Sequence, residues 1–210
     1  HLRAHGAELR EHAAVRALRR SGARWALDGD DGALVEADLV VLASALGSDA
    51  LVRPLGLRLP LVGAKGYSVT VDAPDPAPRM SIYLCEPKLG LTPLDAGLRI
   101  AGYFELGTRD GAPSASRARQ LVSDSAPFLR ALGEPAPHEG PAGWAGFRPS
   151  TPDSLPLIGD VPGARGVVLA TGHGMLGVTL APATGAAVAA IARGEAPGWI
   201  APFAPARFGR

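Results

Sequence analysis

Residues 166–193 read GVVLATGHGMLGVTLAPATGAAVAAIAR, and this stretch decides the fold class. The apolar run at 166–172 predicts a buried strand, and the small residues from Pro182 onward predict a helix with that proline in its first turn. No Asp, Glu, Lys or Arg occurs between Gly166 and Ala192, as in a membrane span. The glycines and the proline instead favour a strand, a turn and a helix.

The turn between this strand and this helix has little side-chain bulk. Gly172, Gly174 and Gly177 leave backbone amides free to approach a flat ligand closely. The helix that follows directs the partial positive charge of its N-terminus toward the same place. A strand, a glycine-rich turn and an alanine-rich helix are also common architecture, so the pattern alone leaves a purely structural role open.

The N-terminal part of the chain has the same α/β texture. Two strand-like pieces, ELREHAAV at 8–15 and ARWALD at 23–28, flank the polar RRSG. The segment LVEADLVVLA at 34–43 follows, and its apolar second half favours a parallel strand that is buried on both faces. The small residues SALGSD at 44–49 come next, at a strand end where open α/β sheets bind ligands.

The middle of the chain alternates between apolar and polar residues with period two, which is typical of half-buried antiparallel strands. A helix is expected over 114–133, with Ser114 or Ser116 as its cap, Gly133 at its end and Pro127 as a kink or split. The expected strands are GYSVTVD (66–72), SIYLC (81–85), GLTPL (90–94) and LRIAGYFEL (98–106).

The order of these segments predicts an α/β fold with an inserted α+β domain that is built on an antiparallel sheet. We expect the first α/β part at 1–60, the inserted domain at 61–143 and the return to the α/β domain at 144–210. A site is expected where the two domains meet.

Charge and cysteine content exclude several classes of function. Lys and Arg number 21 against 20 Asp and Glu, a net charge of +1. No basic stripe indicates a nucleic-acid partner, and no charge run indicates an anionic membrane surface. Cys85 is the only cysteine, which excludes an internal disulfide and a cysteine-rich metal site. We therefore expect a protein of a reducing compartment, without a metal.

Five short motifs follow one another in the C-terminal third: GFRP (146–149), TPD (151–153), LPLIG (155–159), TGHGMLGVT (171–179) and APATG (181–185). Their order, spacing and content resemble the D-amino acid oxidase-like family of FAD-dependent oxidoreductases. The resemblance extends over nearly all of residues 1–210. The markers most similar to the branch of the D-amino acid dehydrogenase small subunit are GYSVTV (66–71), GLTPL (90–94), LRIAGYFEL (98–106) and PFAPARF (202–208).

The resemblance implies that 1–60 and 144–210 are the C-terminal part of an FAD-binding Rossmann-like domain. It implies that 61–143 form an antiparallel-sheet substrate domain. Family members begin with a strand and a Gly-x-Gly-x-x-Gly turn that hold the pyrophosphate of FAD. That N-terminal segment is absent from residues 1–210, so we expect a truncated chain or a fragment.

The resemblance also implies roles for individual residues. Arg148 matches the arginine that holds the substrate carboxylate, because a planar guanidinium can donate two parallel hydrogen bonds to that group. A surface or inter-loop ion pair of Arg148, with Asp153 as one candidate partner, is the structural alternative. Met175 matches a position near the substrate. The residues implied to bind the cofactor are Val15, Gly47, Gly172, His173, Gly174, Met175, Leu176, Gly177, Val178 and Thr179.

No residue is predicted to act as a catalytic acid or base. We interpret His173 as shaping the cofactor loop, because hydride transfer from a bound amino acid requires orientation more than a basic side chain. Some relatives bind the carboxylate with a tyrosine on the inserted sheet, and Gly90 occupies that position here. Tyr67, Tyr83 and Tyr103 are near in strand order but have no assigned role.

The implied activity is FAD-dependent oxidative deamination of a D-amino acid by hydride transfer to flavin N5. A quinone or another carrier would accept the electrons. Two alternatives stay open: a flavoenzyme that oxidises glycine, sarcosine or D-hydroxyproline, and a non-catalytic fragment that cannot hold FAD alone. We expect a cytoplasmic location, with peripheral contact to the inner membrane as the limit of any membrane association.

Overall fold

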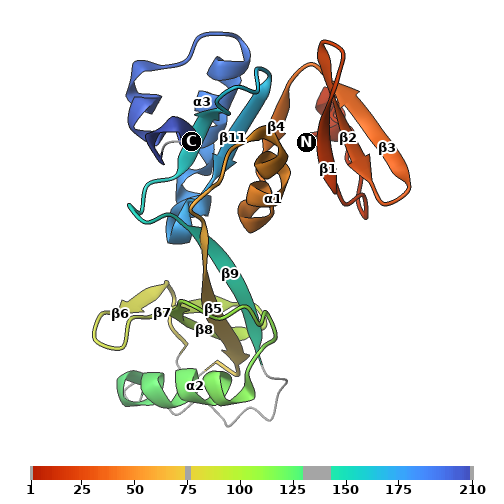
Figure 1. The fold of residues 1–210 in the computed structure, drawn as a ribbon. Coiled ribbons are helices and arrows are strands. Elements are labelled where there is room, and N and C mark those ends of the chain that lie inside the picture. Colours follow the sequence, from red (N-terminus) through yellow and green to blue (C-terminus); the bar gives the residue numbers. More distant parts are fainter. Residues whose placement is uncertain (1, 74–76, 130–142, 209–210) are drawn as a thin grey trace. The chain divides into compact units, whose positions relative to one another are not determined.

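The structure is a computed structural model (Figure 1). It describes residues 2–73, 77–129 and 143–208.

The chain forms two compact units. Unit 2 comprises Val62–Ser150, and unit 1 comprises the sequence on either side, His1–Leu61 and Thr151–Arg210. Unit 2 is therefore inserted into the sequence of unit 1. The second boundary falls after Ser150 and not at 143/144, because residues 144–150 form a strand that pairs with the sheet of unit 2.

The first sheet of unit 1 is an antiparallel meander in the order β1-β2-β3. The strand predicted over 8–15 is wrong. The hairpin forms from residues 17–29 instead, where Leu18 is buried and Arg19 pairs across the hairpin with Asp28. The strands of this sheet are β1 (Ala17–Ser21), β2 (Arg24–Gly29) and β3 (Gly32–Ala37).

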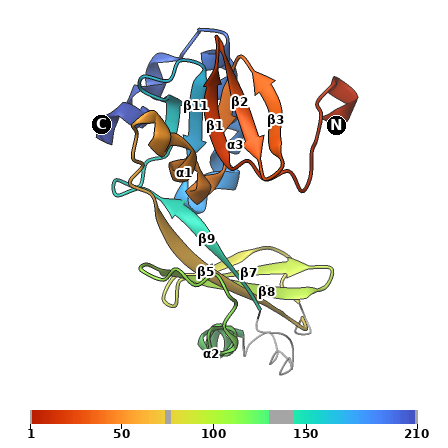
Figure 2. The same cartoon turned by 45° about the vertical axis from the view of Figure 1, so that its right-hand side comes forward.

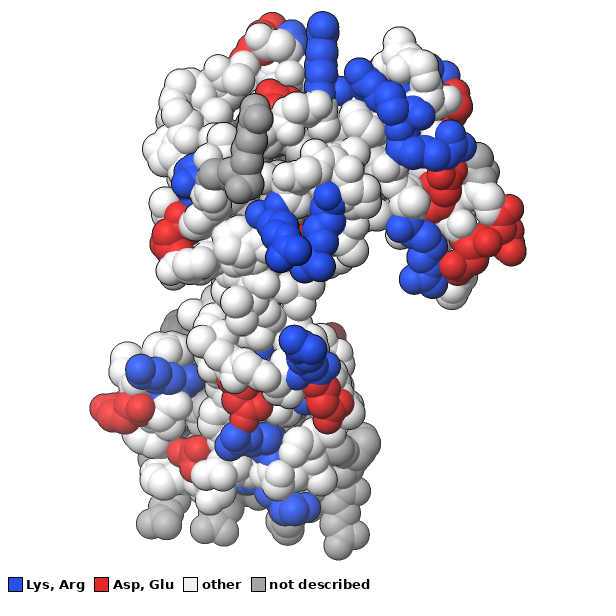
Figure 3. Space-filling model, in the orientation of Figure 1, with Lys and Arg blue, Asp and Glu red and all other residues white. Residues whose placement is uncertain are grey.

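Opposite charges lie next to one another around this sheet (Figure 3). Nε of Arg16 lies 2.8 Å from Oδ1 of Asp30, and Nε of Arg24 lies 3.2 Å from Oδ1 of Asp38. Both pairs are exposed, and exposed ion pairs contribute little to stability. Over β1–β3, the face drawn in Figure 3 therefore has mixed charge.

The second sheet of unit 1 has the order β10-β11-β4. β4 and β11 run parallel, with Val40 opposite Val167, which confirms the predicted parallel strand. β11 is buried on both faces, whereas Val41 in β4 is 41% exposed, so among the described residues β4 is buried on one face only. The strands of this sheet are β4 (Val40–Leu42), β10 (Leu157–Asp160) and β11 (Val167–Thr171).

One face of this second sheet shares a core with the rest of unit 1. Val40 and Leu42 pack with Leu51 of helix α1 (Ser48–Val52) and with Trp25 of the first sheet. Burying these side chains removes apolar surface from water and joins the two sheets of unit 1.

Helix α3 (Gly177–Ala192) covers the other face of the second sheet. It follows β11 after a short 3-10 turn, η5 (Gly174–Leu176), so the predicted order of strand, turn and helix is confirmed. Ala187 and Ile191 of α3 pack on the sheet against Val168.

The start of α3 differs from the prediction. The helix begins at Gly177, so Pro182 lies in its second turn and not in its first. A proline there cannot donate to the carbonyl of Val178, four residues earlier. Of the described helices, Gly174–Ala192 alone is long and apolar enough to cross a membrane, by length and composition.

Unit 2 is built on a five-stranded antiparallel sheet in the order β6-β7-β8-β5-β9. Helix α2 (Ala115–Leu129) lies along one face of this sheet (Figures 1 and 2). Leu121 and Leu129 of α2 share a core there with Val69 and Ile100. The four strands predicted in this region are confirmed. The strands are β5 (Val62–Val71), β6 (Ile82–Leu84), β7 (Leu89–Leu94), β8 (Gly97–Glu105) and β9 (Trp144–Ser150).

The cap of α2 is the first of the two predicted serines. The N–H of Arg117 donates to Oγ of Ser114 at 3.4 Å, which satisfies one free donor of the first turn. The helix continues through Pro127 without a split. The helix end predicted at Gly133 lies outside the described residues.

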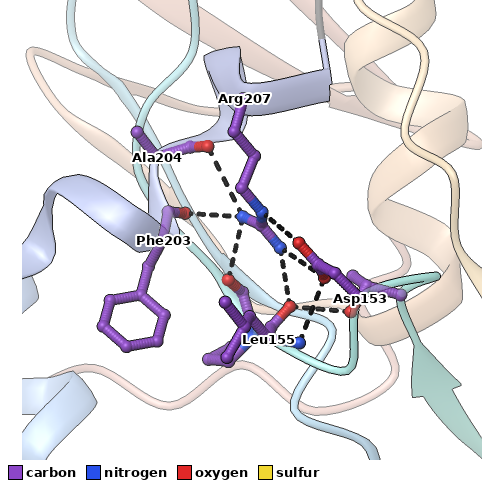
Figure 4. A network of polar contacts seen from close by, with 7 residues as sticks. Asp153, Leu155, Phe203, Ala204 and Arg207 are labelled. Atoms are coloured by element: carbon purple, nitrogen blue, oxygen red, sulfur yellow. Dashed lines mark hydrogen bonds and ion pairs between the residues drawn. The ribbon is translucent and has the colours of Figure 1, made fainter.

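Arg207 ties the C-terminal tail of unit 1 to the turn that precedes β10 (Figure 4). Its Nε and Nη2 donate to the two carboxylate oxygens of Asp153 at 2.7 and 3.1 Å. Further hydrogen bonds reach the carbonyls of Leu155, at 2.7 Å, and of Phe203, at 3.0 Å. The hydrogen bonds from Arg207 hold the pKa of Asp153 well below its usual range. The marker segment PFAPARF therefore contains a structural arginine.

We predict that Arg207→Ala lowers the free energy of unfolding by about 2 kcal/mol, because several hydrogen bonds of a mostly buried guanidinium are lost. Since the folded-state pKa of Asp153 is depressed, its contribution is present above the unfolded-state pKa and is lost as pH falls through the folded-state value. The difference in the free energy of unfolding between Arg207→Ala and the parent should therefore become smaller below about pH 4, as measured by denaturant unfolding.

Arg193→Ala is the matched control. Its pair with Glu195 is more than half exposed on both sides, so this variant should change stability by less than about 0.5 kcal/mol. An equal loss of unfolding free energy in both variants would contradict the structural role of the Arg207–Asp153 pair. A loss in Arg207→Ala that stays the same at acidic pH would contradict it as well.

Candidate functional site

The ends of the parallel strands β4 and β11 bring two predicted cofactor segments together in unit 1. The loop that contains Gly47 follows β4, and the loop that starts at Gly172 follows β11. Oγ1 of Thr171 donates to the carbonyl of Ala45 at 3.1 Å, so the two loops lie side by side. The carboxyl ends of parallel strands are the usual ligand-binding edge of an α/β sheet.

Glycine is required at Gly172 by the protein itself. Its φ is +78°, and an added Cβ would lie 3.0 Å from Cγ2 of Thr151 and 3.3 Å from Cδ2 of Leu61. This residue is buried. A close approach to a ligand is therefore not needed to explain this glycine, although its neighbours in the loop remain accessible.

The loop between β11 and α3 has the spacing Gly-x-Gly-x-x-Gly, formed by Gly172, Gly174 and Gly177. This spacing was not among the features predicted from the sequence. The dinucleotide-binding pattern also requires a second parallel strand after the helix. In the part of the chain that the structure describes, α3 is followed by the 3-10 turns η6 (Gly198–Phe203) and η7 (Pro205–Phe208) instead. The spacing alone is therefore not evidence for a pyrophosphate site.

His173 is engaged within unit 1. Its Nε2 lies 3.0 Å from Oγ1 of Thr184, a buried residue of α3. Burial lowers the pKa of His173, so the imidazole is neutral at pH 7. This contact fixes the loop on the helix and agrees with the interpretation of His173 as a loop-shaping residue.

The remaining loop residues present an apolar surface beside the helix end. Met175 is 71% exposed, Leu176 56% and Val178 92%. The N-cap of α3, Leu176, makes no side-chain hydrogen bond to the first turn, and Thr179 is exposed in that turn. The positive end of a helix next to exposed apolar side chains suits a flat apolar ligand with a negatively charged edge.

The structure gives no specific support to the predicted cofactor roles of Gly47 and Val15. An added Cβ at Gly47 would meet only Ser44, at 3.8 Å, so nothing in the fold requires glycine there. Val15 packs on the core of unit 1 and borders a shallow hollow of about 320 Å³ near Arg10 and Leu34. Their predicted roles stay predictions.

Unit 2 has an open groove of about 640 Å³ on the face of its sheet opposite α2. The alternation of the strands places Ser68 and Thr70 of β5 on this face, while Val69 and Val71 face α2. Residues that line the groove include Ser68, Thr70, Arg99, Ala101, Trp144 and Arg148. Of these residues, Arg148 was predicted from the sequence. The positions of Trp144, Ser68 and Thr70 on the groove follow only from the register between β5 and β9.

The floor of this groove next to Arg148 is bare backbone. Gly66 of β5 pairs with Gly146 of β9. An added Cβ at Gly66 would lie 1.7 Å from Nη1 of Arg148, and one at Gly146 would lie 2.3 Å from the indole of Trp144. The paired glycines therefore let the guanidinium and the indole lie directly on the sheet.

Arg148 has no ion-pair partner among the described residues. The predicted alternative, a pair with Asp153, is wrong, because Asp153 pairs with Arg207. The one hydrogen bond of the Arg148 guanidinium to a described residue runs from Nη1 to the carbonyl of Tyr103, at 3.4 Å. Burial lowers the pKa of Arg148, and the group stays charged at neutral pH. A half-buried cation without a counter-ion is suited to bind a carboxylate.

The tyrosines of unit 2 do not supply a second carboxylate ligand in the groove. Tyr67 donates its hydroxyl to Glu105 at 2.6 Å, and Tyr103 donates its hydroxyl to Asp124 at 2.9 Å. Tyr83 is 62% exposed on β6, opposite Gly90.

Among the described residues, no group of three or more His, Cys, Asp or Glu could hold a metal ion.

Comparison with known proteins shows the family of the chain. The sequence profile of the family described as "FAD dependent oxidoreductase" matches residues 1–191. The chain is 40% identical over 201 residues to a D-amino acid dehydrogenase of Paramagnetospirillum magneticum, covering 91% of this chain and 45% of that protein. It is 34% identical to a D-amino-acid oxidase of Bradyrhizobium diazoefficiens, covering 99% of this chain and 49% of that protein. The chain thus spans about half the length of these curated relatives.

The fold is shared with solved structures. The crystal structure of glycine oxidase from Geobacillus kaustophilus matches with a TM-score of 0.81 at 30% identity, over 96% of this chain and 54% of that one. The crystal structure of an L-proline dehydrogenase from P. horikoshii matches with a TM-score of 0.78 at 22% identity, over 98% of this chain and 56% of that one, and shows the fold alone. The chain therefore belongs to the family of FAD-dependent oxidoreductases.

Proposed function

We propose that the protein oxidises D-amino acids to imino acids with FAD as the hydride acceptor, and that water then hydrolyses the imino acid to the keto acid and ammonia. The observation that carries this proposal is the half-buried guanidinium of Arg148, which has no ion-pair partner among the described residues and lies on bare backbone in an open groove. Relatives with 40% and 34% identity that are named D-amino acid dehydrogenase and D-amino-acid oxidase support the choice of substrate class.

The residues after β11 fit the ring half of FAD. Exposed Met175, Leu176 and Val178 offer apolar contact, and the positive N-terminal end of α3 suits the pyrimidine edge, where negative charge develops on reduction. Bound FAD would supply the acceptor position, N5, for the hydride that leaves the α-carbon. Family members hold the pyrophosphate with an N-terminal strand and turn that residues 1–210 do not contain.

The role of this chain in that reaction is to bind and orient the amino acid. Arg148 would hold the carboxylate through two parallel hydrogen bonds and so fix the plane of the substrate. Trp144, on the same face of the sheet, would offer its indole as an apolar contact for the substrate. His173, bonded to Thr184 and neutral at pH 7, would hold the cofactor loop and transfer no proton.

A second candidate substrate class is glycine or sarcosine. The match to glycine oxidase at a TM-score of 0.81 favours it, and D-hydroxyproline belongs to the same alternative of small imino or amino acids. Turnover of D-alanine, D-proline, glycine and sarcosine by the FAD-loaded protein, expressed from its complete reading frame, separates these readings. The D-amino acid proposal requires the highest kcat/KM for D-alanine, and a clear preference for sarcosine would replace it.

The electron acceptor is proposed to be a quinone or a similar carrier, as the name dehydrogenase of one relative suggests. The same assay tests this by comparing reduction of a soluble quinone with formation of hydrogen peroxide. Rapid peroxide formation without quinone reduction would identify an oxidase. A purified protein that is colourless, and that stays apo after incubation with FAD and removal of the unbound cofactor, would support the non-catalytic alternative.

We predict that Arg148→Ala raises KM for D-alanine about 100-fold, because the carboxylate loses a charged hydrogen-bonding partner in a partly desolvated groove. Arg148→Lys should recover only part of this loss, since an ammonium cannot replace the planar pair of donors. Steady-state kinetics measure both variants. Arg119→Ala, on the exposed side of α2, is the control and should leave KM unchanged. An unchanged KM for Arg148→Ala would remove Arg148 from the site.

We predict that Gly177→Ala weakens FAD binding at least about tenfold without destabilising the apoprotein. Its Cβ would meet only His173, at 3.6 Å, an ordinary contact, so the fold accepts alanine while the surface of the loop becomes bulkier. Gly174→Val is less informative, because a φ of +54° already disfavours valine there. Titration of the apoprotein with FAD measures the effect.

Gly185→Ala is the matched control for the loop. It lies on the same helix with open space around the added Cβ, so its affinity for FAD should equal that of the parent. Normal FAD affinity in Gly177→Ala, or an equal loss in Gly185→Ala, would show that the flavin does not lie on this loop.

A further inference from the structure

Tyr103 has a backbone conformation that tyrosine rarely adopts, at an irregular point in the sheet of unit 2. Its φ is +65°, in the left-handed region that favours glycine. Tyr103 and Phe104 both face Gly66 of β5, because the pairing of β5 with β8 shifts there by one residue. Two residues opposite one form a β-bulge, and with a positive φ its first residue is ordinarily glycine. A tyrosine that remains there despite the strain indicates a local role.

The bulge brings the carbonyl of Tyr103 to the guanidinium of Arg148. Nη1 of Arg148 donates to this carbonyl at 3.4 Å. The same nitrogen lies where a Cβ of Gly66 would be, so the guanidinium is held between the backbone of β5 and the bulge of β8. No other hydrogen bond of this group to a described residue exists, which leaves its remaining donors to a ligand.

Helix α2 holds the side chain of Tyr103 on the opposite face of the sheet. The hydroxyl of Tyr103 donates to Oδ2 of Asp124 at 2.9 Å, and Cζ of Arg117 lies 5.4 Å from the centre of the ring. Asp124 and Arg117 both belong to α2. The strained residue therefore connects the helix on one face with the groove on the other.

We propose that Tyr103 is a positioning residue for Arg148: α2 anchors its side chain, and its carbonyl sets the plane of the guanidinium that receives the substrate carboxylate. This inference rests on the function proposed for Arg148. It extends the site from the groove through the sheet to the helix behind it. Releasing Tyr103 from α2 weakens carboxylate binding and leaves the hydride step unchanged.

The test uses Tyr103→Phe in the FAD-loaded protein expressed from its complete reading frame. Phenylalanine keeps the ring and its contact with Arg117 and removes the hydrogen bond to Asp124. KM for D-alanine should rise about fivefold, and kcat should stay within about twofold. The Kd of propionate, a carboxylate without an amino group to oxidise, should rise by the same factor in isothermal titration calorimetry.

Two further comparisons separate positioning from general stability. In an Arg148→Ala background, Tyr103→Phe should cause no further rise in KM, because the residue acts through Arg148. Asp124→Asn retains an acceptor for the tyrosine hydroxyl and should keep KM near that of the parent, whereas Asp124→Ala should match Tyr103→Phe.

Ser125→Ala is the matched control. It also removes one side-chain hydrogen bond in the same unit, from Oγ of Ser125 to the carbonyl of Val122 at 2.9 Å on α2, and Ser125 does not line the groove. Its melting temperature should fall, with KM and the propionate Kd unchanged.

Three results would overturn the proposal. Tyr103→Phe could lower the melting temperature without changing KM or the propionate Kd, which would leave a structural role alone. It could raise KM equally with and without Arg148, which would show that it does not act through that residue. Arg148→Ala could itself leave KM unchanged, which would reject the function proposed for Arg148 and the positioning role with it.

Discussion

The proposed substrate site depends on a guanidinium that lies on bare backbone without an ion-pair partner among the described residues. The paired glycines Gly66 and Gly146 give Arg148 the room to lie on the sheet. Asp153, its nearest acidic candidate in sequence, is occupied by Arg207. A half-buried cation has lost part of its hydration, so an incoming carboxylate gains more from it than from an exposed arginine. The groove is therefore suited to bind an acidic group.

The second site has a different physical basis. After β11 the chain presents backbone donors and exposed apolar side chains, and His173 fixes this loop by its contact with Thr184. Such a surface suits a flat ring with a polar edge better than a phosphate. Each site lies within one unit, and the chain belongs to the family of FAD-dependent oxidoreductases.

Sequence reasoning predicted the strands and helices well where periodicity was strong. The antiparallel strands of unit 2 and the parallel strand before Gly172 are examples. It failed at 8–15, a segment that pairs with no strand in the described structure, and at the start of α3, where the glycines gave no sign of the five helical residues before Pro182. Single-sequence periodicity cannot detect which segment finds a partner.

The candidate site was predictable only in part. The motif GFRP identified Arg148, and the glycine-rich turn identified the cofactor loop. The role proposed for Tyr103 could not be predicted, because it is argued from a positive φ and from a shift in pairing between β5 and β8. Trp144 was likewise hidden, since its position on the groove follows from the register of β9 on β5. Features set by register and backbone strain leave no pattern in one sequence.

The most direct measurement is a crystal structure of the FAD-loaded protein with propionate bound. The account predicts that both carboxylate oxygens lie about 2.7–2.9 Å from nitrogens of Arg148 and that the flavin ring lies against residues 172–179. A carboxylate bound elsewhere, or a flavin that does not touch this loop, would contradict the account.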